Sequence, residues 1–330
     1  MTNRLKIVLL ILLSLISVFF AEVISGSMRY PLFEIWGYIT VIPLYGLHTI
    51  LLLTIIRGSI KDKKILFSTL YFGGVLFGLY EAYITKVLFT GLTDDAFMVF
   101  NIPIIDYIVL VFFWHPIFSF IIPVLVFEKI IAKTDYVYQG LPNFVKTFLS
   151  KKYGVAILMI IVGLYSAFNG MFDSLTLSEL SLAIPILLII FLIYRKGFNN
   201  QYTLDEILPN KKGIIFSGIY LFGIYFALGV FFLPEVLTLE NQIPIWISYI
   251  VFGCLFYYKI RNNKQIEELP YVESVVPYRS IIYNTIIIMV SGIVFVLLFY
   301  LLGIRDIVVI SIWITWNIIG LYLVMYNIFK

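Results

Sequence analysis

Four ionisable side chains lie inside long apolar runs of this sequence: Glu22, His48, Glu81 and His115. An ionisable group at membrane depth is costly unless it is paired, hydrated or neutralised, so each one marks a candidate site. All four fall in the first four predicted helices, whereas the later apolar runs hold almost no charge near their middles. The clustering favours one functional centre in the N-terminal half of the chain.

Three kinds of chemistry could use such a centre. A carboxylate beside a histidine can take up and release protons during transport, which makes the fewest demands on geometry. His48, His115 and Glu81 match the His-His-Glu ligand set of catalytic zinc, although the sequence contains no HExxH segment. Two histidines would also suffice for haem ligation, but no other haem signal accompanies them. No cofactor is therefore predicted, and zinc and haem stay as alternatives.

The two glutamates are predicted to lie at similar depth, in the outward third of the first and third helices. They could share a site, or each could pair with a cation at the membrane surface, Glu22 with Arg29 and Glu81 with Lys86. Close helix packing is predicted beside Glu81, because three glycines, at positions 73, 74 and 78, precede it.

Each histidine also has a structural interpretation. Pro43 precedes His48 on its helix and Pro116 directly follows His115. A proline inside a helix leaves a backbone carbonyl without its usual donor, and an imidazole could satisfy that carbonyl.

The composition places these residues in a membrane protein. Apolar residues make up 62% of the chain and charged residues 13%, against about a quarter charged in soluble proteins. The apolar runs are continuous rather than alternating, so helices and not strands are predicted. We expect an all-α polytopic bundle with a single integral membrane domain over residues 1–330. With about twenty residues per span, the predicted spans are about 5–25, 35–56, 65–89, 104–127, 154–172, 177–194, 213–233, 243–260, 281–302 and 305–328.

The charges between the spans predict the topology. Most of the 23 Lys and Arg residues lie in alternate gaps, beginning with Arg4, Arg57 and Lys129, while the opposite gaps carry acids such as Asp95 and Glu235. By the positive-inside rule, both termini are cytoplasmic and the protein is a multi-pass protein of the inner (cytoplasmic) cell membrane. Basic residues beside span ends contact lipid headgroups, so the bilayer is the expected partner and nucleic acid is not.

Local patterns predict three further features. Gly26 should end the first helix, with the hydroxyls of Ser25 and Ser27 satisfying the freed carbonyls. Thr203 and Glu206 have the spacing of a reciprocal helix cap. Apolar residues at helical spacing over 141–149, together with nearby lysines, predict a short helix on the cytoplasmic membrane surface.

The segment Ala-Glu-Val-Ile-Ser-Gly-Ser at positions 21–27 resembles a signature in a group of uncharacterised prokaryotic polytopic membrane proteins. The similarity extends more loosely to Tyr45-Gly46 and Tyr80-Glu81. The resemblance implies a site at the outward ends of the first and third helices. That group carries two adjacent carboxylates at this position, whereas this chain has Glu81-Ala82. A mechanism that uses two neighbouring carboxylates of one helix is therefore not expected here.

The leading functional hypothesis is transport or binding of a small solute or lipid at the Glu/His centre. The main alternative is a metal-dependent intramembrane enzyme that acts on a lipid or membrane peptide. CAAX-type intramembrane proteases invite comparison, but they place an adjacent Glu pair before their histidines, and here His48 precedes a single Glu81. The third hypothesis is a non-catalytic scaffold that docks a partner through residues 141–149. An enzyme is the less favoured class.

Overall fold

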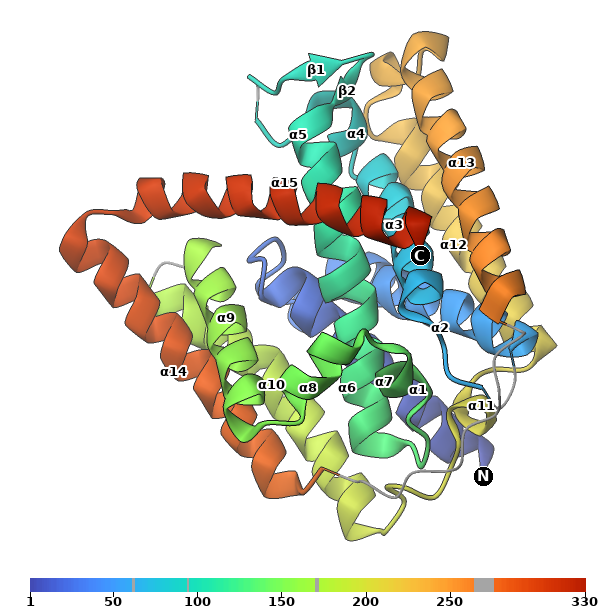
Figure 1. Ribbon diagram of the computed structural model, residues 1–330, viewed down its shortest axis with the longest axis vertical. Helices are drawn as coiled ribbons and strands as arrows, with labels where there is room; N and C mark the ends of the chain where they lie inside the picture. Colours follow the sequence, from blue (N-terminus) through green and yellow to red (C-terminus); the bar gives the residue numbers. More distant parts are fainter. Residues whose placement is uncertain (61–62, 94, 170–171, 264–275) are drawn as a thin grey trace.

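Long helices occupy every predicted position and confirm an all-α fold (Figure 1). The computed structural model describes residues 1–60, 63–93, 95–169, 172–263 and 276–330. Three predicted spans include π-helical turns: α1 (Asn3–Val18) continues into η1 (Phe19–Val23), η2 (Gly37–Val41) leads into α2 (Ile42–Ser59), and α5 (Ile104–Tyr107), η3 (Ile108–Ile121) and α6 (Ile122–Ile131) follow one another directly. The remaining long helices are α3 (Phe67–Ile84), α9 (Lys152–Asn169), α10 (Phe172–Arg195), α12 (Lys211–Phe231), α13 (Leu239–Asn263), α14 (Tyr278–Leu302) and α15 (Arg305–Phe329).

Short elements connect these helices. They are α4 (Val87–Thr90), the strands β1 (Met98–Val99) and β2 (Ile102–Pro103), α7 (Tyr136–Gly140), α8 (Asn143–Leu149), α11 (Leu204–Ile207) and the 3₁₀ turn η4 (Pro234–Val236). The two strands form an antiparallel hairpin that the sequence did not predict. Its two turn residues, Phe100 and Asn101, both have positive φ, as a tight two-residue hairpin turn requires.

The number of membrane spans stays a prediction. In the described part of the chain, 8 helices are long and apolar enough to cross a membrane, or 9 if α8 and α9 form one span bent by 96°. Helix α3 is not among them because its glycines, tyrosines and Glu81 lower its hydropathy. It is instead the most enclosed of the long helices, and lies between η3, α13 and α12.

Helices α3 and η3 pack closely at the centre of the molecule. A Cβ atom on Gly74 would lie 2.4 Å from the Cα atom of Pro116, and one on Gly78 would lie 3.2 Å from the Cβ atom of His115. Only glycine permits this approach, so the predicted glycine-mediated packing beside Glu81 is confirmed. Pro116 lies inside η3 and has no N–H to donate, and the π-helical stretch surrounds it.

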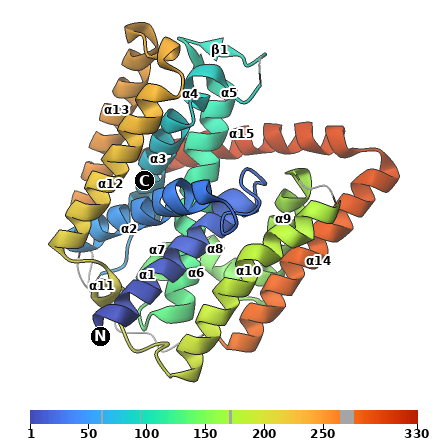
Figure 2. The ribbon, with the colours of Figure 1, turned by 180° about the vertical axis from the view of Figure 1, so that it is seen from behind.

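The remaining helices form two groups on either side of this centre (Figures 1 and 2). Helices α9, α10 and α14 pack together on one side, α12 and α13 lie with α2 and α3 on the other, and α1 runs between the groups. Helix α15 crosses η3 and ends beside α13, where the ammonium of Lys259 donates to the carbonyl of Ile328 at 3.3 Å. The C-terminus therefore lies at mid-height in Figure 1 rather than level with the N-terminus, and the shared cytoplasmic side of the termini stays a prediction.

The membrane span predicted at 65–89 stays a prediction, but its helix is not continuous. Helix α3 stops at Ile84, and Lys86 has a φ of 67°, in the left-handed region that breaks a helix. The separate turn α4 follows. This break turns the Lys86 side chain away from the direction that a continuous helix would give it.

The helix ends predicted at Gly26 and Thr203 are confirmed, and so is the role of Ser25, whereas the Ser27 hydroxyl bonds the Ser25 hydroxyl, at 2.8 Å, instead of a freed carbonyl. Gly26 has a φ of 74°, and the Ser25 hydroxyl donates to the carbonyl of Glu22 at 3.0 Å. Thr203 and Glu206 form both bonds of the capping box before α11. The backbone hydrogen bond from Thr203 lowers the pKa of Glu206, so the cap is intact at neutral pH and is lost only as pH falls through that lowered value.

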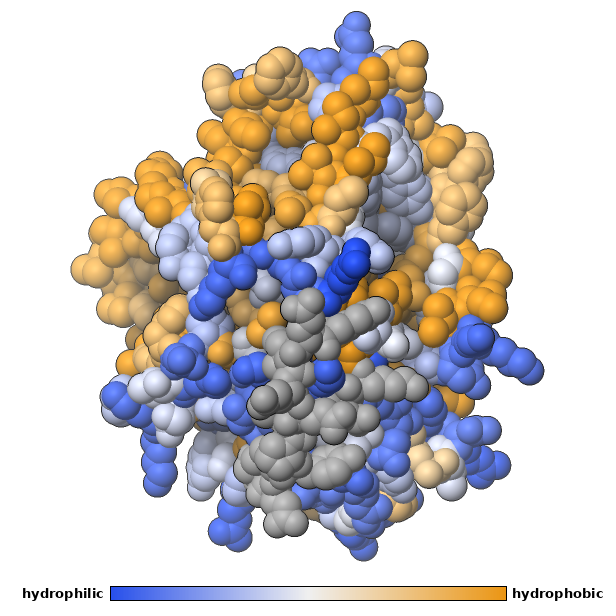
Figure 3. Space-filling model, turned by 45° about the vertical axis from the view of Figure 1, so that its right-hand side comes forward, coloured by the Kyte–Doolittle hydropathy of each residue, from blue (hydrophilic) through white to orange (hydrophobic). Residues whose placement is uncertain are grey.

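The surface of the molecule is divided along its long axis. Figure 3 shows hydrophobic residues over the upper part of one face and hydrophilic residues gathered toward the lower end. The N-terminus lies at that lower end (Figure 1). The short helix predicted at 141–149 is present as α8, which begins after Pro142.

Candidate binding site

Two carboxylates from different helices come together near one end of the bundle. Glu22 lies in the π-helical turn η1 and is 8% exposed, and Glu81 lies in the last turn of α3 and is 9% exposed. The side chain of Tyr45, from α2, lies close to both carboxylates. The second carboxylate beside Glu81 is thus supplied by another helix rather than by position 82.

His115 completes this cluster from η3. Its Nε2 atom lies 2.8 Å from Oε2 of Glu81, and its Nδ1 atom lies 2.9 Å from the hydroxyl of Ser119. The contact with Glu81 is short, but the carboxylate oxygen does not lie along the ring N–H direction, so the pair is close without being aligned as a hydrogen bond. A small rotation of either side chain would make a charge-assisted hydrogen bond or release it. We call Glu22, Tyr45, Glu81 and His115 the carboxylate–histidine cluster.

Buried hydroxyls continue from the cluster into the bundle. The Ser17 hydroxyl donates to the backbone carbonyl of Ser119 at 2.7 Å and lies 3.1 Å from the hydroxyl of Thr49. Ser17, Thr49 and Ser119 are each 0% exposed. These groups hold α1, α2 and η3 together around His115 and fix the orientation of its ring.

The cluster lies at the floor of an open cavity of about 1030 Å³. The turn at Ser25–Ser27, together with Arg29 and Glu34, lines the cavity beyond the cluster, and Glu34 is exposed. Aromatic side chains form much of the wall. Those of Trp114, Tyr165 and Trp316 pack against one another, with ring centroids 5.1–6.3 Å apart. The arrangement combines buried acid groups with aromatic faces, as in sites that hold organic cations.

The other predicted site residues lie apart from the cluster. The ring of His48 packs against Phe77 and Tyr80, at 4.5 Å and 4.6 Å, and its buried Nδ1 atom has no hydrogen-bond partner among the described residues. Phe77 also contacts the ring of His115, at 5.9 Å. Arg29 lines the cavity, but Lys86 is directed at α12, where its ammonium donates to the carbonyl of Gly229. The predicted pairing of Lys86 with Glu81 is therefore not what the structure shows.

The geometry gives no support to the metal alternatives. Within the described residues, no group of three His, Cys, Asp or Glu side chains is arranged to hold a metal ion. Phe77 packs against both histidine rings, so its phenyl ring fills space that a haem between them would need.

Sequence reasoning missed two parts of this region. Tyr45 carried no signal beyond its place in the resemblance, because a tyrosine in an apolar run is ordinary. Glu179 did carry a signal, since it is a lone carboxylate in the run at 177–194. It is 0% exposed and accepts a hydrogen bond of 2.6 Å from the Ser166 hydroxyl, which ties α10 to α9.

Comparison with known proteins places the chain in a family. Residues 11–328 match the model of a family described as "Uncharacterized membrane protein family". A protein of Archaeoglobus fulgidus, described as "Uncharacterized protein", is 30% identical over 261 residues, which cover 77% of each chain. No solved structure matches. The family match spans nearly all of the chain, and the matched region contains several helices that are long and apolar enough to cross a membrane. The protein therefore belongs to this uncharacterized family of multi-pass membrane proteins.

Proposed function

We propose that this protein binds a small organic cation in the cavity and releases a proton from the carboxylate–histidine cluster in exchange, as one step in moving the cation across the membrane. The observation that supports this most is the pair of buried carboxylates, Glu22 and Glu81, which line a cavity of about 1030 Å³ together with Tyr45 and His115. Two carboxylates this enclosed need a proton or a cation to compensate them.

The charges around the cavity favour a positive solute. Of the described residues, Glu22, Glu34 and Glu81 line it, against one guanidinium, that of Arg29. His115 contributes a positive charge only when it is protonated. A cavity with this balance attracts a cation and repels an anion, and the low dielectric of its floor strengthens that preference.

The aromatic wall favours an organic cation over a bare metal ion. Trp114, Tyr165, Trp313 and Trp316 line the cavity, and Trp313 and Trp316 have ring centroids 5.7 Å apart. Quaternary and alkylated ammonium groups bind over such faces, within about 6 Å of a ring centroid. A hard metal ion would instead require several oxygen ligands in a fixed geometry.

Proton exchange follows from the contact between His115 and Glu81. When a cation enters and neutralises the carboxylates, a proton held in the cluster becomes dispensable, and His115 can take it up and pass it on. When a proton returns, the cation is displaced. This competition couples the two ions, because both compensate the same pair of carboxylates.

The orientation of the protein in the membrane is taken from the sequence predictions. We infer a single integral membrane domain over residues 1–330 in the cytoplasmic membrane, with both termini on the cytoplasmic side. The cavity then opens toward the outer face, because the basic residues gather at the opposite end of the predicted spans. An intramembrane enzyme is the second hypothesis, but no specific contact in the described residues favours it over binding.

The intrinsic fluorescence of the protein can test this proposal. The chain has 5 tryptophans, and Trp36, Trp114, Trp313 and Trp316 line the cavity. Titration with tetraethylammonium in detergent should change the emission saturably, whereas methanesulfonate should not. The apparent affinity for tetraethylammonium should rise with pH between 6 and 8, because fewer protons then compete for the carboxylates. An equal response to both ions, or an affinity independent of pH, would contradict the proposal.

A further inference from the structure

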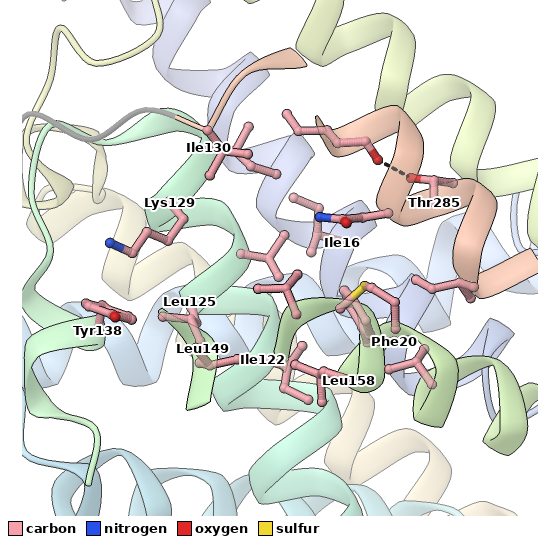
Figure 4. Close-up of a pocket in the computed structure, with 18 of the residues that line it drawn as sticks. Ile16, Phe20, Ile122, Leu125, Lys129, Ile130, Tyr138, Leu149, Leu158 and Thr285 are labelled. Carbon is pink, nitrogen blue, oxygen red and sulfur yellow. Dashed lines mark hydrogen bonds between the residues drawn. The ribbon is translucent and has the colours of Figure 1, made fainter. Parts of the chain in front are cut away.

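A second cavity lies away from the carboxylate–histidine cluster. Its volume is about 810 Å³, and it is enclosed by α1, α6, α9, α10 and α14, with α7 and α8 at one end. Figure 4 shows Ile16, Phe20, Ile122, Leu125 and Leu158 lining it. Within the apolar part the lining residues are almost all Ile, Leu, Val, Phe and Met, and the polar Asn284 and Thr285 lie on α14. The Thr285 hydroxyl is already bonded to the carbonyl of Ile281, at 3.0 Å.

The apolar walls demand an apolar occupant. Apolar surface left in contact with water is unfavourable, so an apolar space of this size is not expected to stay unoccupied. Water would find few partners along these walls, and apolar cavities exclude it. A hydrocarbon chain can pack against these apolar walls. The volume of the cavity also lies within the range of roughly 300–1,000 Å³ that is typical of ligand pockets.

One end of the cavity is basic. Among the residues that the structure describes, Lys129, Lys151 and Lys152 line it, together with one carboxylate, that of Asp135. Lys129 is occupied within the protein, because its ammonium lies 2.7 Å from the Asp135 carboxylate and 3.9 Å from the centroid of the Tyr138 ring. Lys151 and Lys152 take no part in this ion pair between Lys129 and Asp135. Both residues are exposed.

The backbone at this end also favours an anion. Helix α9 begins at Lys152 and has 18 residues, so the positive end of its dipole faces the same place as the two lysines. The bend of 96° between α8 and α9 brings this helix start to the mouth, while Leu149 of α8 lines the cavity. A basic helix start above an apolar space complements a molecule with an anionic head and hydrocarbon tails.

We propose that this cavity is a binding site for an anionic phospholipid, with the acyl chains in the apolar space and the headgroup phosphate at Lys151 and Lys152. The site is separate from the cation cavity and does not depend on the proposed function. Lys129, which is held by Asp135, lies on the α6 side of the cavity beside Tyr138 (Figure 4). The bound lipid joins α1 and α6 to the group formed by α9, α10 and α14 and so acts as part of the bundle.

Native mass spectrometry of the detergent-purified chain tests this directly. Phosphatidylglycerol should bind at least about tenfold more tightly than phosphatidylcholine, because two lysines near a headgroup each favour an anionic lipid. The double variant Lys151→Gln/Lys152→Gln should lose that preference. The matched control is Lys211→Gln/Lys212→Gln, which removes two exposed lysines from the start of α12, outside this cavity.

A cavity-filling variant tests the apolar part of the proposal. Ala183 on α10 lines the cavity and is 4% exposed, and Ala183→Leu should reduce binding of both lipids while leaving the headgroup preference intact. The proposal is overturned if the wild-type chain binds the two lipids equally, or if the Lys211/Lys212 control loses the preference as completely as the Lys151/Lys152 variant.

Discussion

Replacing Glu81 with glutamine is expected to weaken tetraethylammonium binding at least about thirtyfold, since loss of a buried charge partner costs about 2 kcal/mol or more. Glutamine keeps the shape of the side chain and removes only its charge. The contact of Glu81 with His115, at 2.8 Å, and its closeness to Glu22 and Tyr45 place it at the centre of the cluster. Titration of tryptophan fluorescence at pH 7.5 measures the effect.

The control for this substitution is Glu34→Gln. Glu34 lines the same cavity but is exposed, so water screens its charge and its loss should change the affinity less than about fivefold. Thermal unfolding of each variant in detergent verifies that the fold is intact. If both substitutions have equal effects, the cavity acts through its overall charge and the cluster has no special role.

The second large effect is expected at the opposite, basic end of the bundle. Arg57 is 2% exposed and makes a bidentate ion pair with Asp205 of α11, through Nε and Nη2 at 2.7 Å and 2.6 Å. Its guanidinium also lies 3.9 Å from the centroid of the Tyr136 ring. Asp205→Asn leaves this buried cation without its charge partner and should lower the free energy of unfolding by about 3 kcal/mol.

A double-mutant cycle shows whether the unpaired charge causes that loss. Arg57→Met/Asp205→Asn removes both charges and should be more stable than Asp205→Asn alone, because an apolar side chain in this site needs no partner. Unfolding by sodium dodecyl sulfate in mixed micelles, followed by circular dichroism, measures each variant. Purely additive effects would show that the pair contributes little and that α11 is held to α2 by other contacts.

Local features of this fold were predictable because they depend on residues close in sequence. Gly26 ends the first helix and Thr203 caps α11 through bonds that span three residues or fewer. The all-α architecture follows in the same way from continuous apolar runs, since a backbone in lipid must satisfy its own hydrogen bonds. Such inferences require no knowledge of which helices are neighbours.

The candidate site was predictable only in part. The cost of burying a carboxylate singled out Glu22 and Glu81, and their similar depth indicated a shared site. The closeness of Tyr45 to both carboxylates and the contact of His115 with Ser119 depend on how far each helix is rotated about its axis, which the sequence does not specify. His48 met the same criterion as His115, but its helix turns it toward Phe77 and Tyr80.

Charged residues near helix ends were the hardest to place. Arg57 and Lys86 lie at the ends of predicted spans, where contacts with the membrane surface are expected, yet both are buried, at 2% and 1% exposed. Each charge is satisfied by a segment distant in sequence, Arg57 by α11 and Lys86 by the carbonyl of Gly229 on α12. The left-handed backbone at Lys86 decides its direction, and a hydropathy pattern contains no information on such a break.

The central claim is that cation binding displaces a proton from the carboxylate–histidine cluster. Isothermal titration calorimetry with tetraethylammonium, in phosphate and in Tris at the same pH, measures this most directly because the two buffers differ in their heat of protonation. The account predicts different apparent binding enthalpies that correspond to a proton released for each cation bound, and a smaller difference in Glu81→Gln. Clear binding with the same enthalpy in both buffers would show that no proton is exchanged, and would contradict the account.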